Sequence, residues 1–240
     1  MTTTQVPRGQ TAVGTNSEIV DILVRPFTPD SLRTILDIPC GGGEFLDVIA
    51  KLFPHWRLIG VDLSPPGAQT DFEFAKLDIG TSTLTELEVR PDVVTCISGV
   101  MEFDNTLGFI RNIREVIRED GLLIVTNDNL LTVRDRLLFL FLGRYGQYPL
   151  SLSPKGPTWK VTPLQNLVRV LHDGGFVVEQ LRYVPVRPSN WLWLPLALPL
   201  YLLSWLRIKL HSEGPGLERE ALVLRGFLSK HYLLVCRPRA

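Results

Sequence analysis

The chain has 240 residues, a length that fits one α/β domain with additions better than two separate domains. Its 25 basic and 25 acidic side chains cancel, so we expect no nucleic-acid partner, because such proteins present broadly basic surfaces. With 45% hydrophobic residues the chain is not disordered throughout, and its mean hydropathy of +0.14 is high for a soluble enzyme.

The cysteines and the N-terminal residues indicate the cellular compartment of the protein. Cys40, Cys96 and Cys236 are widely spaced, with no CxxC pair and no histidine at ligand spacing. This pattern predicts free thiols in a reducing cytosol and no metal site. Residues 1–10 are polar and lack the apolar core of a signal peptide, so we expect a cytoplasmic protein.

The first half of the chain alternates apolar runs with helical patterns. Ser17 can cap a helix that runs to Val24. We expect strands at 35–38, 58–62, 72–77, 93–97 and 122–126, and helices at 46–53 and 107–117. A glycine-rich turn, residues 39–43, follows the first strand.

In the second half, Thr162 followed by Pro163 predicts a helix start, and Gly174 ends that helix. The last strands are expected at 176–183 and 232–236. Strands that alternate with helices indicate a parallel sheet covered on both faces, so the predicted fold class is α/β, doubly wound.

Acidic residues follow the predicted strands near the glycine-rich turn. Asp62 ends the second strand, where nucleotide-binding βαβ units hold ribose hydroxyls, and Asp37 and Asp78 lie at the same rim. A strand, a glycine-rich turn and a helix let backbone N–H groups approach a ligand. Each acid can also be an ordinary strand-end or turn residue. A nicotinamide site is a weaker alternative, because its third glycine would fall at Leu46.

These segments resemble the class I S-adenosylmethionine-dependent methyltransferases. Residues 35–46 resemble the first motif, acid-x-Gly-x-Gly-x-Gly: Asp37, Gly41 and Gly43 match, and Pro39 replaces the first glycine. Residues 60–64 resemble the second motif, 76–79 the third, 92–103 the fourth strand with its loop, and 119–124 the approach to the fifth strand. The resemblance covers about residues 33–185.

The resemblance implies a Rossmann-like methyltransferase fold, with a mostly parallel seven-stranded sheet and S-adenosylmethionine as cofactor. In that family the acid at Asp62 holds the ribose diol, and the acid at Asp78 lies near the adenine amino group. The cofactor-binding residues that it implies are Asp37, Pro39, Cys40, Gly41, Gly43, Asp62, Leu63, Asp78, Ile79 and Ser98. Only about nine residues, 63–71, join the second and third strands, so the helix usually found there is expected to be one turn long or missing.

Methyl transfer to a hydroxyl would benefit from a general base. Glu102 and Asp104 after the fourth strand and Asp128 after the fifth are candidates at the predicted rim. Each is more often a helix cap or a solvated loop acid than a base, so the residues alone assign no base.

Residues 191–206 form an apolar insertion with tryptophans at its ends and Arg207 and Lys209 behind it, flanks typical of membrane interfaces. Sixteen helical residues reach about 24 Å, short of a hydrocarbon core of roughly 30 Å, and Pro195 and Pro199 disfavour one straight span. If strands 176–183 and 232–236 share a sheet, a single crossing is impossible. The segment must lie in the interface, re-enter, or fold as a buried helix pair.

A second apolar run, residues 137–142, has Arg134, Arg136 and Arg144 as neighbours, and residues 217–227 suggest an amphipathic helix. Both apolar runs leave the predicted sheet at the cofactor rim. We therefore expect a hydrophobic or lipid-linked acceptor and peripheral contact with the cytoplasmic face of a membrane through residues 191–206.

The predicted organisation is one methyltransferase domain over residues 1–240. It comprises an N-terminal arm and helix (1–32), a cofactor-binding core (33–184), an apolar and amphipathic insertion (185–230) and a last strand (231–240). The alternative function is a non-catalytic, membrane-associated binding module that keeps the fold. The sequence gives no oligomeric state.

Overall fold

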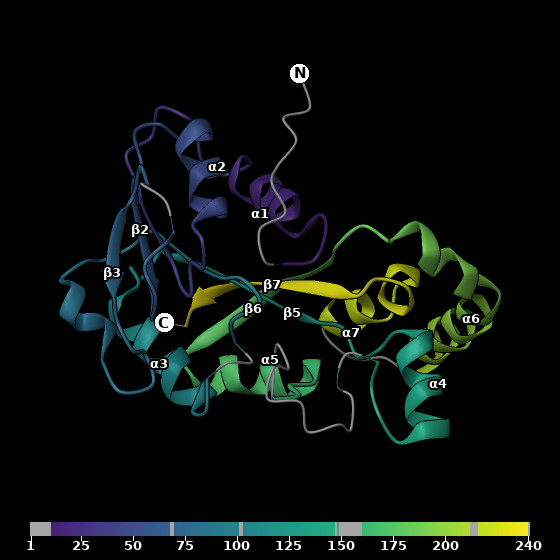
Figure 1. The fold of residues 1–240 in the computed structure, drawn as a ribbon. Coiled ribbons are helices and arrows are strands. Elements are labelled where there is room, and N and C mark those ends of the chain that lie inside the picture. Colours follow the sequence, from purple (N-terminus) through teal and green to yellow (C-terminus); the bar gives the residue numbers. More distant parts are fainter. Residues whose placement is uncertain are drawn as a thin grey trace.

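The computed structural model describes residues 11–67, 70–100, 103–146, 148, 160–211 and 216–239. The strands in this part of the chain are β1 (Thr34–Asp37), β2 (Arg57–Asp62), β3 (Glu73–Lys76), β4 (Val93–Cys96), β5 (Leu122–Asp128), β6 (Phe176–Tyr183) and β7 (His231–Pro238). They form a seven-stranded sheet in the order β3-β2-β1-β4-β5-β7-β6 (Figure 1). β7 is antiparallel to β5 and β6, and the other pairs are parallel, so the predicted doubly wound, mostly parallel α/β fold is confirmed.

Helices cover both faces of this sheet. The α-helices described are α1 (Thr15–Leu23), α2 (Glu44–Leu52), α3 (Thr106–Val116), α4 (Val133–Leu142), α5 (Leu164–Asp173), α6 (Leu194–His211) and α7 (Gly216–Ala221). Short 3-10 helices are η1 (Leu84–Leu87), η2 (Pro188–Trp193) and η3 (Leu224–Phe227).

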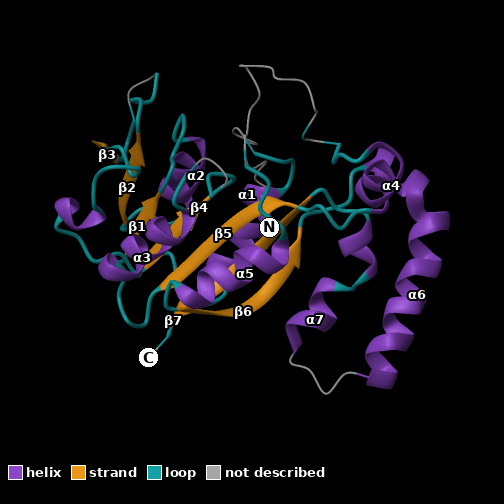
Figure 2. Cartoon of the chain, turned by 90° about the horizontal axis from the view of Figure 1, so that it is seen from below, coloured by secondary structure: helices purple, strands orange, loops and turns teal. Residues whose placement is uncertain are grey.

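Successive residues of the buried strands point to opposite faces and build two core clusters. Leu36 and Val94 pack with α3 and α5 on one face. Ile35 and Val93 pack with α1 and α2 on the other face (Figures 1 and 2). A third, smaller cluster joins α4, α6 and η3 beyond the carboxyl ends of β5 and β6. The chain thus carries an additional unit at one end of a regular three-layer core.

Two predicted helix starts are wrong. α1 begins at Thr15, after Gly14 with a φ of 88°, and is not capped by Ser17. α5 begins at Leu164 with Pro163 in the N-cap position, and the Thr162 hydroxyl that should have capped it is buried without a hydrogen-bond partner among the described residues. In both places the backbone conformation of a glycine or proline sets the turn, so no capping side chain is required.

The predicted short connection between β2 and β3 agrees with the structure, since residues 63–67 and 70–72 contain no helix. The predicted amphipathic helix at 217–227 is instead two helices, α7 and η3. Gly226 approaches the Ala221 carbonyl so closely that a Cβ on it would lie 2.7 Å from that oxygen. This tight reversal interrupts the helix.

The apolar insertion is neither a buried helix pair nor broken by its prolines. α6 runs without interruption for 18 residues with Pro199 inside it. Pro195 lies in the first turn, where N–H groups have no partner in the helix, so only the Pro199 hydrogen bond is lost. Within the described residues, Pro188–Leu210 is one helical segment long and apolar enough to cross a membrane, judged by length and composition alone.

Candidate functional site

The glycine-rich turn is held between the ends of β1 and β2. The Cys40 N–H donates to the Val61 carbonyl at 2.9 Å, and the Gly41 N–H donates to Asp62 Oδ2 at 2.9 Å. Gly43 has a φ of 85°, and a Cβ on it would lie 2.4 Å from the Phe72 ring. The turn therefore requires glycine at position 43 and is tied to β2 by an acidic side chain.

Pro39 stands where the motif has its first glycine, and Cys40 follows it. A Cβ on Gly99 would lie 2.1 Å from Pro39 Cδ, so the proline ring packs directly on the loop after β4. Burial raises the pKa of the Cys40 thiol to about 12. The thiol therefore stays protonated and cannot act as a nucleophile at neutral pH.

Asp37 ends β1 and is only 2% exposed. Thr95 Oγ1 donates to Asp37 Oδ1 at 2.6 Å. The pKa of Asp37 is raised to about 7, chiefly by burial; the Thr95 hydrogen bond opposes this rise, and the nearby Asp62 and Glu44 carboxylates add to it. A positively charged ligand group beside Asp37 would favour its ionised form.

Asp62 and Leu63 follow one another at the end of β2. Asp62 Oδ1 accepts from the Ser64 N–H at 3.3 Å, while its other oxygen binds the glycine-rich turn. The Leu63 side chain is 59% exposed. A carboxylate and an exposed apolar side chain thus adjoin the turn, and their contacts with the cofactor stay predictions.

Asp78 lies beyond β3 and has the contacts of a turn residue. Its Oδ1 accepts from the Gly80 N–H at 2.9 Å, and its carbonyl accepts from the N–H groups of Thr81 and Ser82. The Asp78 side chain is exposed and that of the adjacent Ile79 is half-buried. Their contact with an adenine group stays a prediction.

The three candidate bases have different outcomes. Glu102 lies outside the described residues. Asp104 is exposed in the turn before α3, and its backbone carbonyl accepts from Lys160 Nζ at 3.0 Å. Asp128 was predicted to lie after the fifth strand. It is instead the buried last residue of β5, because the pairing of β5 with β7 extends as far as Asp128 and His231.

Asp128 belongs to a buried chain of polar side chains at the rim. His231 Nδ1 lies 2.8 Å from Asp128 Oδ1, and His231 Nε2 lies 3.0 Å from Ser98 Oγ. Ser98 Oγ is also 2.8 Å from Thr11 Oγ1, and the Ser98 N–H donates to Thr126 Oγ1 at 2.9 Å. His231 was not among the site residues predicted from the sequence. Its position directly before the predicted last strand could have indicated it, because an antiparallel last strand begins at the rim where the parallel strands end.

A sequence profile described as a methyltransferase domain matches residues 15–181 of the chain. The chain belongs to this family. Together with its structural neighbours, the match identifies a class I S-adenosylmethionine-dependent methyltransferase. The alternative of a non-catalytic binding module finds no support in these comparisons.

Similar proteins include two curated enzymes. The ubiquinone biosynthesis O-methyltransferase of Methylobacterium sp. (strain 4-46) is 27% identical over 181 residues, 70% of each chain. The mitochondrial ubiquinone biosynthesis O-methyltransferase of Schizosaccharomyces pombe (strain 972 / ATCC 24843) is 24% identical over 193 residues, covering 74% of this chain and 68% of that enzyme.

Solved structures share the fold. An S-adenosylmethionine-dependent methyltransferase from Archaeoglobus fulgidus superposes with a TM-score of 0.57 at 17% identity, covering 93% of this chain and 95% of that chain. Coclaurine N-methyltransferase bound to N-methylheliamine and S-adenosylhomocysteine superposes with a TM-score of 0.55 at 14% identity, covering 92% of this chain and 70% of that chain.

The residues of the methyltransferase rim fit the cofactor chemically. Gly43 is kept free of a side chain by its conformation and by Phe72. Asp37 and Asp62 provide carboxylates for a cationic group and for hydroxyls, and Leu63 provides an exposed apolar contact. In the described part of the chain, no group of three or more His, Cys, Asp or Glu side chains could hold a metal ion.

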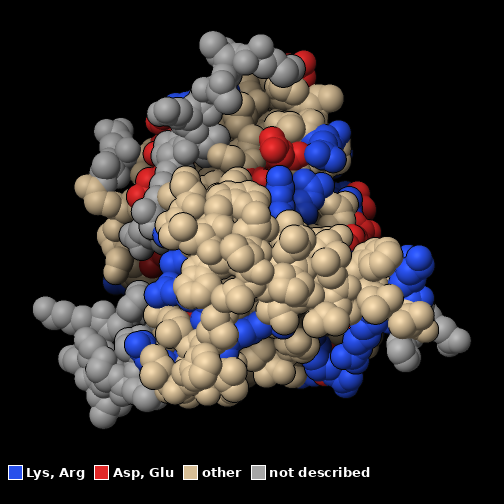
Figure 3. Space-filling view, turned by 90° about the vertical axis from the view of Figure 1, so that its right-hand side faces the viewer, with Lys and Arg blue, Asp and Glu red and all other residues tan. Residues whose placement is uncertain are grey.

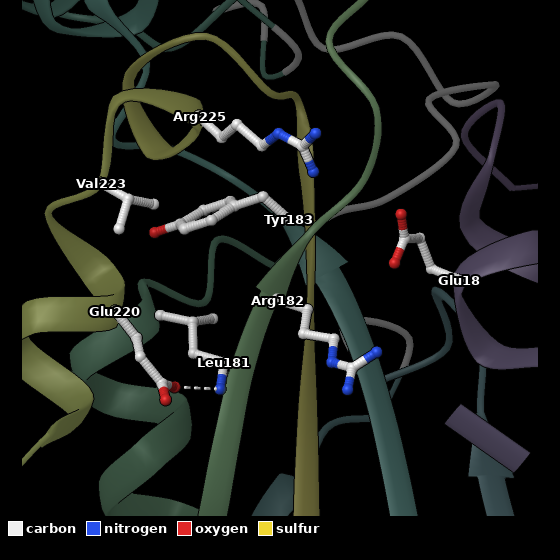
Figure 4. A pocket seen from close by; sticks show the side chains of 7 residues that line it. All are labelled: Glu18, Leu181, Arg182, Tyr183, Glu220, Val223 and Arg225. Atoms are coloured by element: carbon white, nitrogen blue, oxygen red, sulfur yellow. Dashed lines mark hydrogen bonds between the residues drawn. The ribbon is translucent and has the colours of Figure 1, made fainter. Parts of the chain in front are cut away.

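A cavity of about 290 Å³ lies near the sheet edge at β6, four strands away from β1 (Figure 4). It is lined by Glu18, Leu181, Arg182, Tyr183, Glu220, Val223 and Arg225. The Glu220 carboxylate accepts from the Leu181 N–H at 2.6 Å, and the Tyr183 hydroxyl donates to the Ala221 carbonyl at 2.9 Å. These bonds fasten α7 to β6, so we assign the cavity a structural role.

Proposed function

We propose that this methyltransferase transfers a methyl group from S-adenosylmethionine to a hydrophobic or lipid-linked small molecule. It would act in the cytoplasm, bound peripherally to the cytoplasmic face of a membrane. The observation that carries this proposal is an exposed apolar surface on α4 and α6, which follow the rim ends of β5 and β6. The single-domain organisation set out from the sequence is part of the same proposal.

The α4–α6 surface is made of large apolar side chains that no other part of the described structure covers. It consists of Phe139, Leu140, Phe141, Leu142, Trp191, Leu192, Leu196, Leu198, Leu202, Leu203, Trp205, Leu206 and Leu210. Phe141 is 74% exposed and Leu203 is 64% exposed, whereas Ala197 is the buried residue of α6. Single exposed leucines are ordinary, but a contiguous set on adjacent helices indicates an interaction surface.

The chemistry of α6 favours a lipid partner over a protein partner. A helix lying between protein and water needs a polar face, and one that is apolar on all sides is buried or in lipid. α6 is not buried, and it contains no acidic residue. Arg134, Arg144 and Arg207 flank the apolar segments, and Lys209 Nζ lies 5.0 Å from the centre of the Trp205 ring. Figure 3 shows basic side chains around a broad uncharged area at this end of the molecule.

The connections of α6 favour a helix lying in the membrane surface over one that crosses it. α6 starts beside η2 and η3, and its last residue, His211, is five residues before Gly216. Five residues span at most roughly 18 Å, and α7 is bound to β6 through Glu220 and Leu181. Both ends of α6 are therefore tied to segments that pack on the sheet, and Figure 2 shows α6 on the outer side of α7, which supports a monotopic arrangement.

The proposed cofactor residues are those implied by the sequence motifs: Asp37, Pro39, Cys40, Gly41, Gly43, Asp62, Leu63, Asp78, Ile79 and Ser98. Their clustering at the ends of β1, β2, β3 and β4 supports this assignment. Two relatives are O-methyltransferases of ubiquinone biosynthesis, which supports an oxygen atom on a hydrophobic acceptor as the methylated atom.

Membrane binding can be tested by sedimentation with phosphatidylcholine–phosphatidylglycerol vesicles. The double variant Phe141→Glu/Leu203→Glu should lose most vesicle binding, because it places two charges in the α4–α6 surface. Leu32→Glu is the matched control, since Leu32 is 80% exposed in the loop between α1 and β1. Equal binding by the two variants and the wild type would contradict the membrane assignment.

The acceptor class can be tested by incubating bacterial membranes with methyl-labelled S-adenosylmethionine and the enzyme. Label should enter the fraction extracted by organic solvent. Label that appears only in water-soluble small molecules would contradict a lipid-linked acceptor while leaving methyl transfer intact.

A further inference from the structure

We propose that Ser98, His231 and Asp128 form a proton relay that deprotonates the acceptor, which is therefore an alcohol or a phenol. This inference rests on the methyl-transfer part of the proposed function and not on its membrane part. It assigns to the buried polar chain at the rim the general base that the sequence motifs leave open.

The relay is assembled from three neighbouring strands of the sheet. Ser98 lies two residues beyond β4, Asp128 ends β5 and His231 begins β7. The pairing of Asp128 with His231 across the β5–β7 ladder sets the carboxylate beside the imidazole. The hydrogen bond from the Ser98 N–H to Thr126 holds the serine loop against the same strand. Regular sheet geometry thus places Asp128 and His231, and the loop after β4 brings Ser98 to them.

Hydrogen bonding gives the relay a direction. An ionised Asp128 only accepts hydrogen bonds, so His231 Nδ1, at 2.8 Å, must carry a proton. In a neutral imidazole the other nitrogen is then an acceptor, and Ser98 Oγ, at 3.0 Å, donates to it. Since Ser98 has a single hydroxyl proton, Thr11 must donate to Ser98 Oγ across their 2.8 Å contact. Protons can therefore move from the Thr11 side toward Asp128.

The buried Thr11 side chain occupies the Ser98 end of the relay. Thr11 precedes α1 and places its Oγ1 at hydrogen-bond distance from Ser98 Oγ. An acceptor hydroxyl takes this position by displacing the Thr11 hydroxyl. The site adjoins the glycine-rich turn, because Gly99, next to Ser98, is packed on Pro39.

The proposed step balances in atoms and charge. Bound S-adenosylmethionine supplies an electrophilic methyl carbon, and the electron pair of the broken carbon–sulfur bond stays on sulfur. The acceptor oxygen forms the new bond to carbon and passes its proton to Ser98 Oγ, while the Ser98 proton moves to His231 Nε2. Asp128 stabilises the imidazolium that forms, and His231 later releases the proton to water.

Other titratable side chains near the relay are less suited to act as the general base. Burial raises the pKa of the Cys40 and Cys96 thiols, which therefore stay protonated. The Asp37 carboxyl lies at the end of β1 and already accepts a hydrogen bond from the Thr95 hydroxyl. The same three relay groups could also form a hydrolase triad, an alternative that covalent labelling of Ser98 distinguishes from the relay.

The first test needs no acceptor. The chain has four histidines, His55, His172, His211 and His231, so nitrogen-15 spectra of histidine-labelled enzyme are simple to assign with His231→Gln. Near neutral pH, His231 should be neutral and protonated at Nδ1. Ser98→Ala should shift the Nε2 resonance, and Asp128→Asn should reverse the tautomer. A His231 that is doubly protonated, or protonated only at Nε2, cannot accept the proton and would overturn the relay.

The second test measures methyl transfer to the solvent-extractable acceptor of bacterial membranes. His231→Gln should lower kcat by about 10²- to 10⁴-fold with little change in the affinity for S-adenosylhomocysteine measured by calorimetry. Ser98→Ala and Asp128→Asn should each lower kcat by about tenfold or more. His172→Gln, at an exposed position on α5, is the matched control and should behave as wild type.

The two tests distinguish a failure of the proposed relay from a failure of the proposed function. No label transferred by the wild type would contradict methyl transfer to this acceptor, and the histidine spectra would still decide the relay. Full activity of His231→Gln, alongside an active wild type, would overturn the relay alone. Labelling of Ser98 by a fluorophosphonate would identify a nucleophilic serine and would also overturn it.

Discussion

Asp37 makes the stability of the enzyme depend on pH in a direction opposite to that of most carboxylates. Its pKa is raised by burial from an ordinary value of 3.8 to about 7. Between these values the folded chain keeps a proton that the unfolded chain has lost, so the free energy of unfolding falls as pH rises. The stability is fully present below pH 4 and is lost as pH rises through 7, with a total change of roughly 4 kcal/mol at most.

Urea denaturation at pH 5 and pH 8 measures this effect. We expect Asp37→Asn, which keeps an acceptor for Thr95 but cannot ionise, to be more stable than wild type at the higher pH. The difference should shrink at the lower pH. A difference between the two proteins that does not vary with pH would contradict the raised pKa.

Asp62 serves the fold and the proposed ribose contact at once. Asp62→Ala leaves the Gly41 N–H without its acceptor, which should cost about 1 kcal/mol of stability. The affinity for S-adenosylhomocysteine should fall about tenfold or more, because a charged hydrogen-bond partner contributes roughly 1.5 kcal/mol or more. Calorimetry measures both binding and unfolding. Unchanged affinity in a folded variant would remove Asp62 from the cofactor site.

Local sequence patterns predicted the acids at the strand ends. They could not predict the contacts among Ser98, His231 and Asp128. Asp62 and the glycine-rich turn are 21 residues apart and belong to one βαβ unit with a known geometry. Ser98 and His231 are 133 residues apart, and only the antiparallel placement of β7 brings them together. Residue type and spacing carry no information about that contact.

The glycine-rich turn has little room for an added methyl group at Gly43. Gly43→Ala combines a positive φ with a Cβ 2.4 Å from the Phe72 ring, so the free energy of unfolding should fall by about 2 kcal/mol or more. Gly143→Ala, at a φ of 63° in open space, isolates the conformational cost. Gly67→Ala has neither problem and should match wild type. Equal stabilities for Gly43→Ala and Gly143→Ala would exclude the clash with Phe72.

Element prediction succeeded where burial produces a pattern and failed where it does not. The helices α2, α3 and α5 show apolar periodicity because one face of each packs on the core, and the central strands are apolar runs because both of their faces are buried. α6 has no such periodicity, and its prolines argued against one helix. The sequence therefore predicted an apolar segment but not its helical shape, since a helix that is exposed on most sides is not patterned by a protein core.

At the scale of the whole molecule, the charges are distributed unevenly: the net charge is zero, but Lys and Arg side chains surround the α4–α6 surface. Binding to anionic vesicles should weaken with added salt, because arginine and lysine contacts with lipid headgroups are screened. Binding to purely zwitterionic vesicles should be weaker but insensitive to salt, because it depends on apolar burial. Vesicle sedimentation across a salt series measures both. Complete loss of binding to zwitterionic vesicles would indicate an electrostatic contact without insertion.

The position of β7 also determines the order in which the enzyme can be completed during synthesis. β6 has β7 as its neighbour in the sheet, and β7 is the last strand of the chain. Because β7 follows α6 in the chain, it leaves the ribosome after α6, so at that point β5 and β6 lack the strand that separates them and His231 is not yet in place. The apolar helix is thus exposed before β7 completes the rim, so the proposed membrane contact can precede the final closure of the sheet.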